Sequence, residues 1–225
     1  MNAPATTLTY RDPWRWMWML SLWVPAFVAT GPGLMQWTGD AMALWWPLIF
    51  LYGVVPLADA LIPPSRHNPP ESAVAALEND AYYRHITYAL VPVLWGAFIF
   101  AAWFVSTHDL AWHGWLAMVL ATGAVGGFGI NLAHEMGHKQ ILQGLAITAA
   151  LWSVLVLWLG PHVLGFILPV AMWTNFQLTS ANYVEHYGLK RLQLPDGGYE
   201  RCQPRHSWNS NHVVSNWMLF HLQRH

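Results

Sequence analysis

Long apolar runs constrain the fold of this chain more than any other feature. In a bilayer core the backbone polar groups have no water to bond with, so an apolar run of about 20 residues is typical of a membrane-spanning helix. The chain has five such apolar runs. The last is long enough for two spans, and the sequence GPH at 160–162 interrupts it near its middle. The runs cover residues 16–37, 42–62, 86–105, 112–134 and 141–182. We therefore predict an all-α integral membrane protein with six transmembrane helices.

The composition supports this class and excludes several functions. Hydrophobic residues make up 55% of the 225 residues and charged residues only 9%, whereas a soluble domain has about 25% charged residues. The formal net charge of −1 argues against a nucleic-acid partner. The single cysteine, Cys202, can form neither an intrachain disulfide nor a CxxC metal site. Any metal would therefore need nitrogen or oxygen ligands.

The basic residues predict the orientation in the membrane. All ten Lys and Arg lie before the first expected span, between the second and third, after the fourth, or after the sixth. Loops rich in these residues stay on the cytoplasmic side. We therefore expect both termini in the cytoplasm, with the loops near residues 38–40, 107–113 and 160–162 on the opposite side.

Two histidines four residues apart end the fourth apolar run, in the sequence NLAHEMGHK at 131–139. His134 and His138 would share one helix face and could bind one metal ion together. Two histidines and Glu135 in a membrane helix would be costly without a function. The sequence thus predicts a metal site here, but the motif alone does not choose the metal.

Two later stretches place more histidines on the same predicted side. In NFQLTSANYVEHYGLKR, at 175–191, an apolar span ends in polar residues and then presents Glu185 and His186. The stretch HSWNSNHVVSNWMLFHLQRH, at 206–225, is dense in His, Asn and Trp and ends at His225. We predict that these three histidine-containing stretches, called histidine boxes below, meet at the cytoplasmic ends of the helices.

These three stretches together resemble the membrane alkane monooxygenase family, the integral-membrane di-iron hydroxylases related to fatty-acid desaturases. The resemblance rests on HEMGHK, on NYVEHYG with QLTSAN before it, and on HSWNSNHVVSN followed by LFHLQRH. The segments YGVVPLAD at 52–59, NPPE at 68–71 and YYRHITY at 82–88 also look like that family. The resemblance therefore covers nearly the whole chain.

Two pieces of the family pattern have no match. The family carries a second box of the form EHxxGHH after the first, and its last box continues as LQRHSDHH. Here only Lys139 and Gln140 separate the box HEMGH from the fifth run, and neither is a Gly, Pro or Asn that would turn the chain; this is the shortest of the about 2 to 8 residues that such connections take. We therefore expect one hydroxylase domain over 1–225 that lacks a segment between Gln140 and Ile141 and a C-terminal portion after His225.

The resemblance implies a cofactor of two non-haem iron ions. Four histidines match the family's ligands residue by residue: His134, His138, His186 and His225. Glu135 and Glu185 would orient the metal-bound imidazoles, because a ligating histidine usually donates its other N–H to a carboxylate or carbonyl.

The resemblance also implies a reaction and its partners. Rubredoxin and its NAD(P)H-dependent reductase would supply electrons at a bacterial inner membrane. O2 would insert one oxygen atom into the terminal C–H bond of an n-alkane and release the other as water. The substrate would occupy an apolar channel, in which Leu51 would limit the chain length.

Two alternatives stay open. HEMGH also fits the HExxH motif of an intramembrane zinc protease, with Glu135 as the general base on zinc-bound water. Such an enzyme needs a third ligand, and Asp59 is the only aspartate in the long apolar spans. The second alternative is a catalytically silent hydroxylase scaffold that has lost part of its ligand set.

Overall fold

The computed structural model describes residues 10–65, 73, 77, 79–137, 141–195, 197–200, 204–208 and 210–220, and it describes their side chains except at 130–137, 141–145 and 204. Within these residues every regular element is a helix, and the only extended pairing is an isolated bridge between Gln193 and Tyr199. The predicted all-α class is therefore confirmed.

The first two spans are continuous but irregular helices. The first, Arg15–Thr38, consists of η1 (Arg15–Leu22), α1 (Trp23–Ala26), η2 (Phe27–Ala29) and α2 (Thr30–Thr38). The second, Ala41–Leu61, consists of η3 (Ala41–Trp45), α3 (Trp46–Ile49), the π turn η4 (Phe50–Val54) and α4 (Val55–Leu61). Each span contains two prolines, which remove backbone donors and disturb the regular hydrogen-bond ladder. The mixed 3₁₀, α and π turns follow from this.

The remaining helices are longer and more regular. They are α6 (Ala81–Thr107), α7 (Trp112–Gly137), α8 (Ile141–Leu159) and α9 (Leu164–His186), followed by η6 (Pro204–His206) and α10 (Val213–Leu219). The short η5 (Pro161–Val163) joins α8 to α9. Gly160 before it has φ +91°, which a residue with a side chain rarely adopts. The expected break at 160–162 therefore lies at the turn between two helices.

Three helical stretches are long and apolar enough to cross a membrane within the described part of the chain: Arg15–Thr38, Ala41–Leu61 and Ala81–Thr107. The helices α7 and α9 have 26 and 23 residues, lengths that also suit a crossing at 1.5 Å per residue. All six expected segments coincide with helices. The number of six crossings remains a prediction.

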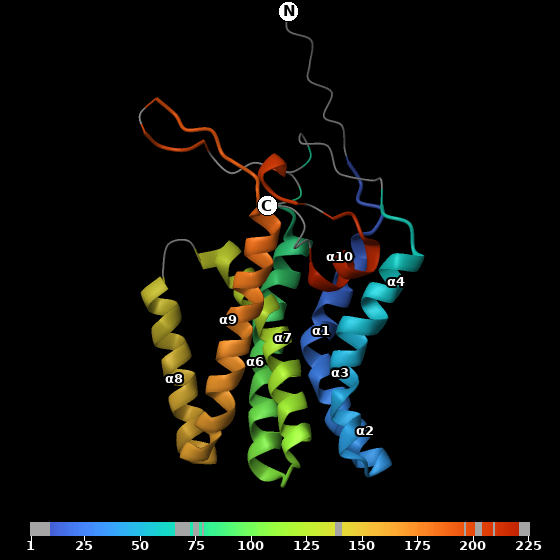
Figure 1. Ribbon diagram of the computed structural model, residues 1–225, viewed down its shortest axis with the longest axis vertical. Helices are drawn as coiled ribbons and strands as arrows, with labels where there is room; N and C mark the ends of the chain where they lie inside the picture. Colours follow the sequence, from blue (N-terminus) through green and yellow to red (C-terminus); the bar gives the residue numbers. More distant parts are fainter. Residues whose placement is uncertain are drawn as a thin grey trace, which may run out of the picture.

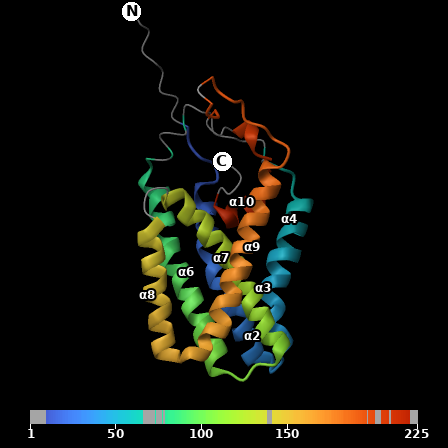
Figure 2. The same cartoon turned by 60° about the vertical axis from the view of Figure 1, so that its left-hand side comes forward.

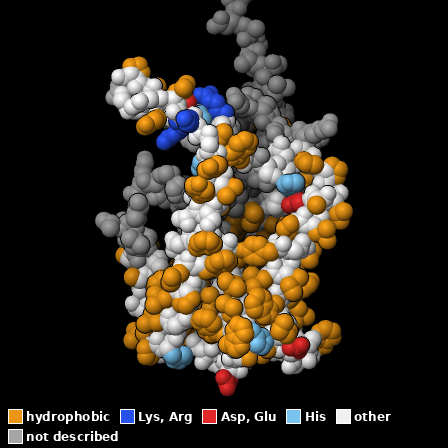
Figure 3. Space-filling view, viewed as in Figure 1, with side chains coloured by type: hydrophobic (Ala, Val, Ile, Leu, Met, Phe, Trp, Pro, Cys, Tyr) orange, Lys and Arg blue, Asp and Glu red, His pale blue; other side chains and the backbone are white. Residues whose placement is uncertain are grey.

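The helices stand side by side and alternate in direction (Figures 1 and 2). The start of η1, the ends of α4, α7 and α9, and the helix α10 gather at one end, which we call the α10 end. The turns after α2, α6 and α8 lie at the other end. Apolar side chains cover the bundle in Figure 3, and the Lys and Arg side chains visible on that face lie at the α10 end. The side of the membrane that the α10 end faces remains a prediction.

Glycines allow α7 and α9 to approach closely along their length. A Cβ atom built on Gly126 would lie 2.5 Å from Thr174 Oγ1, and one on Gly123 would lie 2.6 Å from a ring carbon of Trp173. The buried Thr174 hydroxyl donates a hydrogen bond to the Gly123 carbonyl at 3.0 Å. Small residues at such contacts are a common means of packing helices in a membrane.

We expect Gly126→Ala to destabilise the bundle by about 1–3 kcal/mol, because the new methyl group must displace Thr174. The matched control is Gly96→Ala on α6, where a Cβ meets nothing within 4 Å. Thermal unfolding of both variants in the same detergent measures the difference. Equal losses in the two variants would argue against a close α7–α9 contact.

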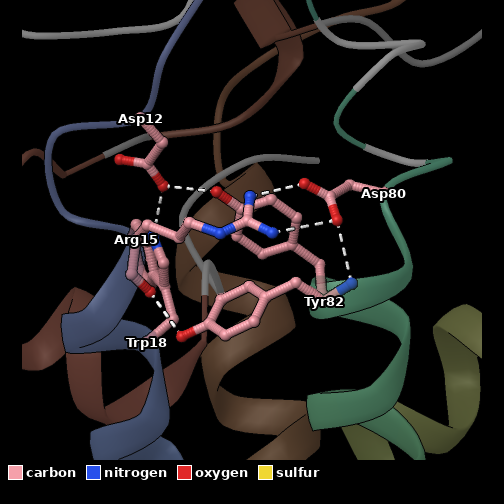
Figure 4. A network of polar contacts seen from close by, with 6 residues as sticks. Asp12, Arg15, Trp18, Asp80 and Tyr82 are labelled. Atoms are coloured by element: carbon pink, nitrogen blue, oxygen red, sulfur yellow. Dashed lines mark hydrogen bonds and ion pairs between the residues drawn. The ribbon is translucent and has the colours of Figure 1, made fainter.

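A polar network ties the first span to the start of α6 (Figure 4). The Asp12 carboxylate accepts hydrogen bonds from the indole N–H of Trp18 and the hydroxyl of Tyr83, each at 2.6 Å. Tyr82 donates its hydroxyl to the backbone carbonyl of Arg15 at 2.7 Å. The network thus joins two segments that are far apart in the sequence.

An ion pair completes this connection at the α10 end. The two terminal guanidinium nitrogens of Arg15, Nη1 and Nη2, donate to the Asp80 carboxylate, and the guanidinium carbon lies 4.3 Å from the centroid of the Tyr82 ring. Asp80 also caps α6 by accepting the Tyr82 backbone N–H. The hydrogen bonds from Arg15 and then from Tyr82 hold the pKa of the Asp80 carboxyl below its usual range.

Candidate active site

An apolar cavity of about 400 Å³, partly open at the surface, lies between the helices and extends toward the α10 end. Its walls come from α1, η4, α4, α7 and α9, and its cover comes from Met218 and Leu219 of α10. The apolar wall residues include Val24, Leu51, Val55, Val125, Phe128 and Leu178. Figure 3 shows this face hollowed beside α9, with apolar side chains inside. The cavity suits a ligand without hydrogen-bonding groups.

Leu51, which the sequence singled out, lies in the π turn η4 and lines this cavity. A change in its side-chain volume would alter the space available inside. Its proposed influence on substrate length remains a prediction, but its position in the wall is compatible with that role.

The cavity has a polar end formed by Glu185, Trp208 and Ser210. Trp208 donates its backbone N–H to the Glu185 carbonyl and its indole N–H to the Tyr187 carbonyl, each at 2.8 Å. These bonds satisfy carbonyls at the end of α9, which a helix terminus otherwise leaves without partners. They also fold the chain after α9 back over the cavity.

His186, at the last position of α9, has a defined partner for one ring nitrogen. Its Nδ1 lies 2.7 Å from the backbone carbonyl of His206. A carbonyl can only accept, so Nδ1 must carry the hydrogen and Nε2 has a lone pair in the neutral ring. Metal-binding histidines usually make this kind of hydrogen bond through the nitrogen that does not bind the metal. His186 therefore fits the chemistry of an imidazole ligand.

Glu200 holds the turn that provides this carbonyl. Its carboxylate accepts the Leu192 backbone N–H at 2.9 Å, pairs with Arg205, and lies 3.1 Å from Nε2 of the buried His206. The Leu192 N–H, and then the charge of Arg205, hold the pKa of Glu200 below its usual range. Sequence reasoning missed both Glu200 and the His206 carbonyl, because the contacts depend on how the chain returns after α9.

Asp59 holds α10 in place. Only 6% of this residue is exposed, and its two carboxylate oxygens accept the backbone N–H groups of Val214 and Ser215 at 2.8 and 3.1 Å. These N–H groups belong to the first turn of α10, where the helix itself provides no carbonyl to accept them. The zinc-protease alternative relied on Asp59 as its third ligand. Because the carboxylate is engaged by α10, that alternative would need a different residue.

The other predicted site residues are described less fully. His134 and Glu135 lie in the last turn of α7, where the backbone is described and the side chains are not. His138 and His225 lie outside the described residues. No group of three or more His, Cys, Asp or Glu side chains within the described residues could hold a metal. The ends of α7 and α9 nevertheless lie at the same end of the bundle (Figure 2), so convergence of the histidines remains a prediction.

Glu185 was predicted to orient a metal-bound histidine. The structure places it at the polar end of the cavity, one residue before His186. The carbonyl of His206, rather than this carboxylate, is the hydrogen-bond partner of His186 Nδ1. Glu185 is thus positioned beside the candidate ligand and also faces the cavity.

Comparison with known proteins shows two kinds of similarity. A family model described as fatty acid desaturase matches residues 139–225. The chain is 34% identical to alkane 1-monooxygenase 1 of Alcanivorax borkumensis, over 96% of this chain and 74% of the relative. It is 33% identical to alkane 1-monooxygenase of Pseudomonas putida, over 100% and 78%, and 33% identical to that of Ectopseudomonas oleovorans, over 96% and 75%.

The lengths of these alignments are also informative. They run over 302, 313 and 300 positions, whereas this chain has 225 residues. Each aligned region of a relative must therefore include positions that have no counterpart in this chain.

Proposed function

This chain belongs to the alkane 1-monooxygenase family, and from this membership we propose that it hydroxylates the terminal carbon of n-alkanes to 1-alkanols with O2. The apolar cavity is the observation that carries the proposal. It is lined by Leu51 and other apolar side chains, and its polar end reaches Glu185, beside His186. An alkane offers nothing to hydrogen-bond, so length and shape would govern its binding.

We propose two non-haem iron ions as the cofactor, with His134, His138, His186 and His225 among their ligands. The similarity to fatty acid desaturases and the hydrogen bond made by His186 support this proposal. The iron, when bound, would supply the activation of O2. Glu135 and Glu185 are proposed to orient the imidazoles.

The chain's own residues would bind and shield the substrate. The apolar walls would hold the alkane extended toward the polar end, and Leu51 would limit how far it enters. Met218 and Leu219 of α10 would exclude water from above. Asp59 would maintain this cover through its hydrogen bonds to α10.

The partners and location follow from the same proposal. Rubredoxin with its reductase would deliver electrons at the α10 end, which would face the cytoplasm of a bacterium. The exposed apolar side chains of Trp23, Trp37 and Leu157 would contact lipid. No nucleic-acid partner is expected.

A specific observation favours a second candidate, a hydroxylase scaffold that is catalytically silent. The alignments exceed the length of this chain, which supports the absence of a segment that the relatives have; we propose that it falls between Gln140 and Ile141. In the family pattern that segment carries the second histidine box. A chain without it would keep the cavity but have too few nitrogen ligands for two irons.

One experiment separates these functions. The protein is purified in detergent, its iron and zinc are quantified by elemental analysis, and n-octane conversion is followed by gas chromatography with rubredoxin, reductase, NADH and O2 supplied. About two irons per chain together with 1-octanol formation would support the hydroxylase. An absence of stoichiometric metal and of product would identify the silent scaffold. About one zinc per chain would instead support the zinc-protease alternative.

A further inference from the structure

A second hollow lies on the outer surface of the bundle. It is an open apolar groove of about 650 Å³ between α3, η4, α7 and α9, and its lining includes Ile49, Leu120 and Trp173. Figure 1 shows α7 between α3 and α9 at this level. Ile49 is 55% exposed and belongs to the apolar span Ala41–Leu61. The groove therefore faces the hydrocarbon of the membrane.

Two side chains line both this outer groove and the inner cavity. They are Tyr52 of η4 and Gln177 of α9. The Gln177 side-chain amide donates a hydrogen bond to the Tyr52 hydroxyl. Because both residues line both hollows, this bonded pair lies where the groove and the cavity adjoin.

The surroundings make the pair a closed but breakable contact. Tyr52 is 53% exposed within the apolar span Ala41–Leu61, so its hydroxyl would face lipid rather than water, and each polar group satisfies the other. A single neutral hydrogen bond contributes only modestly to stability, because water or other groups can replace it during an opening. Tyr52 also lies in a π turn, next to Gly53, which has nothing within 4 Å of its Cβ position. A small movement of this turn would separate the pair.

We infer that Tyr52 and Gln177 form a gate through which a hydrocarbon chain passes from the lipid into the cavity. The identity of the ligand as an alkane rests on the proposed function. Alkanes dissolve in the lipid, and the other end of the cavity carries Glu185, Trp208 and Ser210, which offer an apolar chain no favourable path. Tyr52 and Gln177 are the two residues common to the linings of the groove and the cavity.

A thiol placed behind the gate tests this without any need for turnover. Cys202→Ser removes the only natural cysteine, and Ala124→Cys places one in the cavity wall. The protein is put in lipid nanodiscs and reacted with N-cyclohexylmaleimide, which partitions into the lipid. Tyr52→Phe and Gln177→Leu, each in this background, should raise the labelling rate about three- to tenfold, the shift that corresponds to loss of one hydrogen bond.

The matched control is Asn175→Leu, two residues before Gln177 on α9. The Asn175 amide donates to the Ala171 carbonyl of its own helix at 2.8 Å, and the residue lines neither hollow. Its labelling rate should not change. Unchanged labelling in both gate variants, or an equal rise in the control, would overturn the gate. Gated labelling in a protein that forms no alkanol would overturn the proposed function and leave the gate standing.

Discussion

Replacement of His186 by alanine should abolish alkane hydroxylation and reduce the iron that the purified protein retains. The imidazole lies at the end of α9, and its Nδ1 is held by the His206 carbonyl. The substitution removes Nε2, the nitrogen that would bind iron. Removal of a group that only supports a ligand costs about 10- to 100-fold in metal affinity, so the loss of the ligand itself should exceed that range.

Elemental analysis and turnover, measured together, test this prediction. His186→Gln serves as a second variant, since it retains a polar side chain but no imidazole. The control is His108→Ala, because His108 lies at the opposite end of the bundle and bonds the Phe104 carbonyl of its own helix. Unchanged iron content and activity in His186→Ala would remove this residue from the ligand set.

The second large effect should come from Asp59→Ala. The substitution leaves the N–H groups of Val214 and Ser215 without their acceptor at a buried position. Loss of a helix cap and of two hydrogen bonds to a charged group should weaken the docking of α10 by about 3 kcal/mol. Amide hydrogen exchange in α10 should then accelerate by about two orders of magnitude.

Hydrogen exchange followed by mass spectrometry, in lipid nanodiscs, measures this opening. Asp59→Asn should give a smaller effect, since one oxygen can still accept. The control is Asp40→Ala, which removes an exposed cap that accepts the Met42 N–H at the opposite end. If exchange in α10 were the same in Asp59→Ala and the unaltered protein, Asp59 would not be what holds α10.

The helical framework could be predicted closely from the sequence. Each expected span coincides with a helix, and the break at 160–162 coincides with η5. The physical reason is local: a chain in hydrocarbon must satisfy its backbone hydrogen bonds within each segment. The resemblance to a known family also pointed to His186, whose role as a metal ligand remains a prediction; the structure shows only that its Nδ1 bonds the His206 carbonyl.

The contacts that shape the site could not be predicted from the sequence. Tyr52 and Gln177 are 125 residues apart, and Asp59 and Val214 are 155 apart. No periodicity in either segment signals these pairs, because they depend on how each helix rotates and packs against its neighbours.

The sequence by itself determined the class of the protein, its helical segments and its family, because apolar length and local motifs are properties of neighbouring residues. Only the tertiary structure decided that Asp59 accepts hydrogen bonds from α10, that the His206 carbonyl bonds His186 Nδ1, and that Gln177 bonds Tyr52 where the groove and the cavity adjoin. These are contacts between distant segments. Helix packing brings these segments together, and close approaches such as that of Gly126 to Thr174 permit this packing.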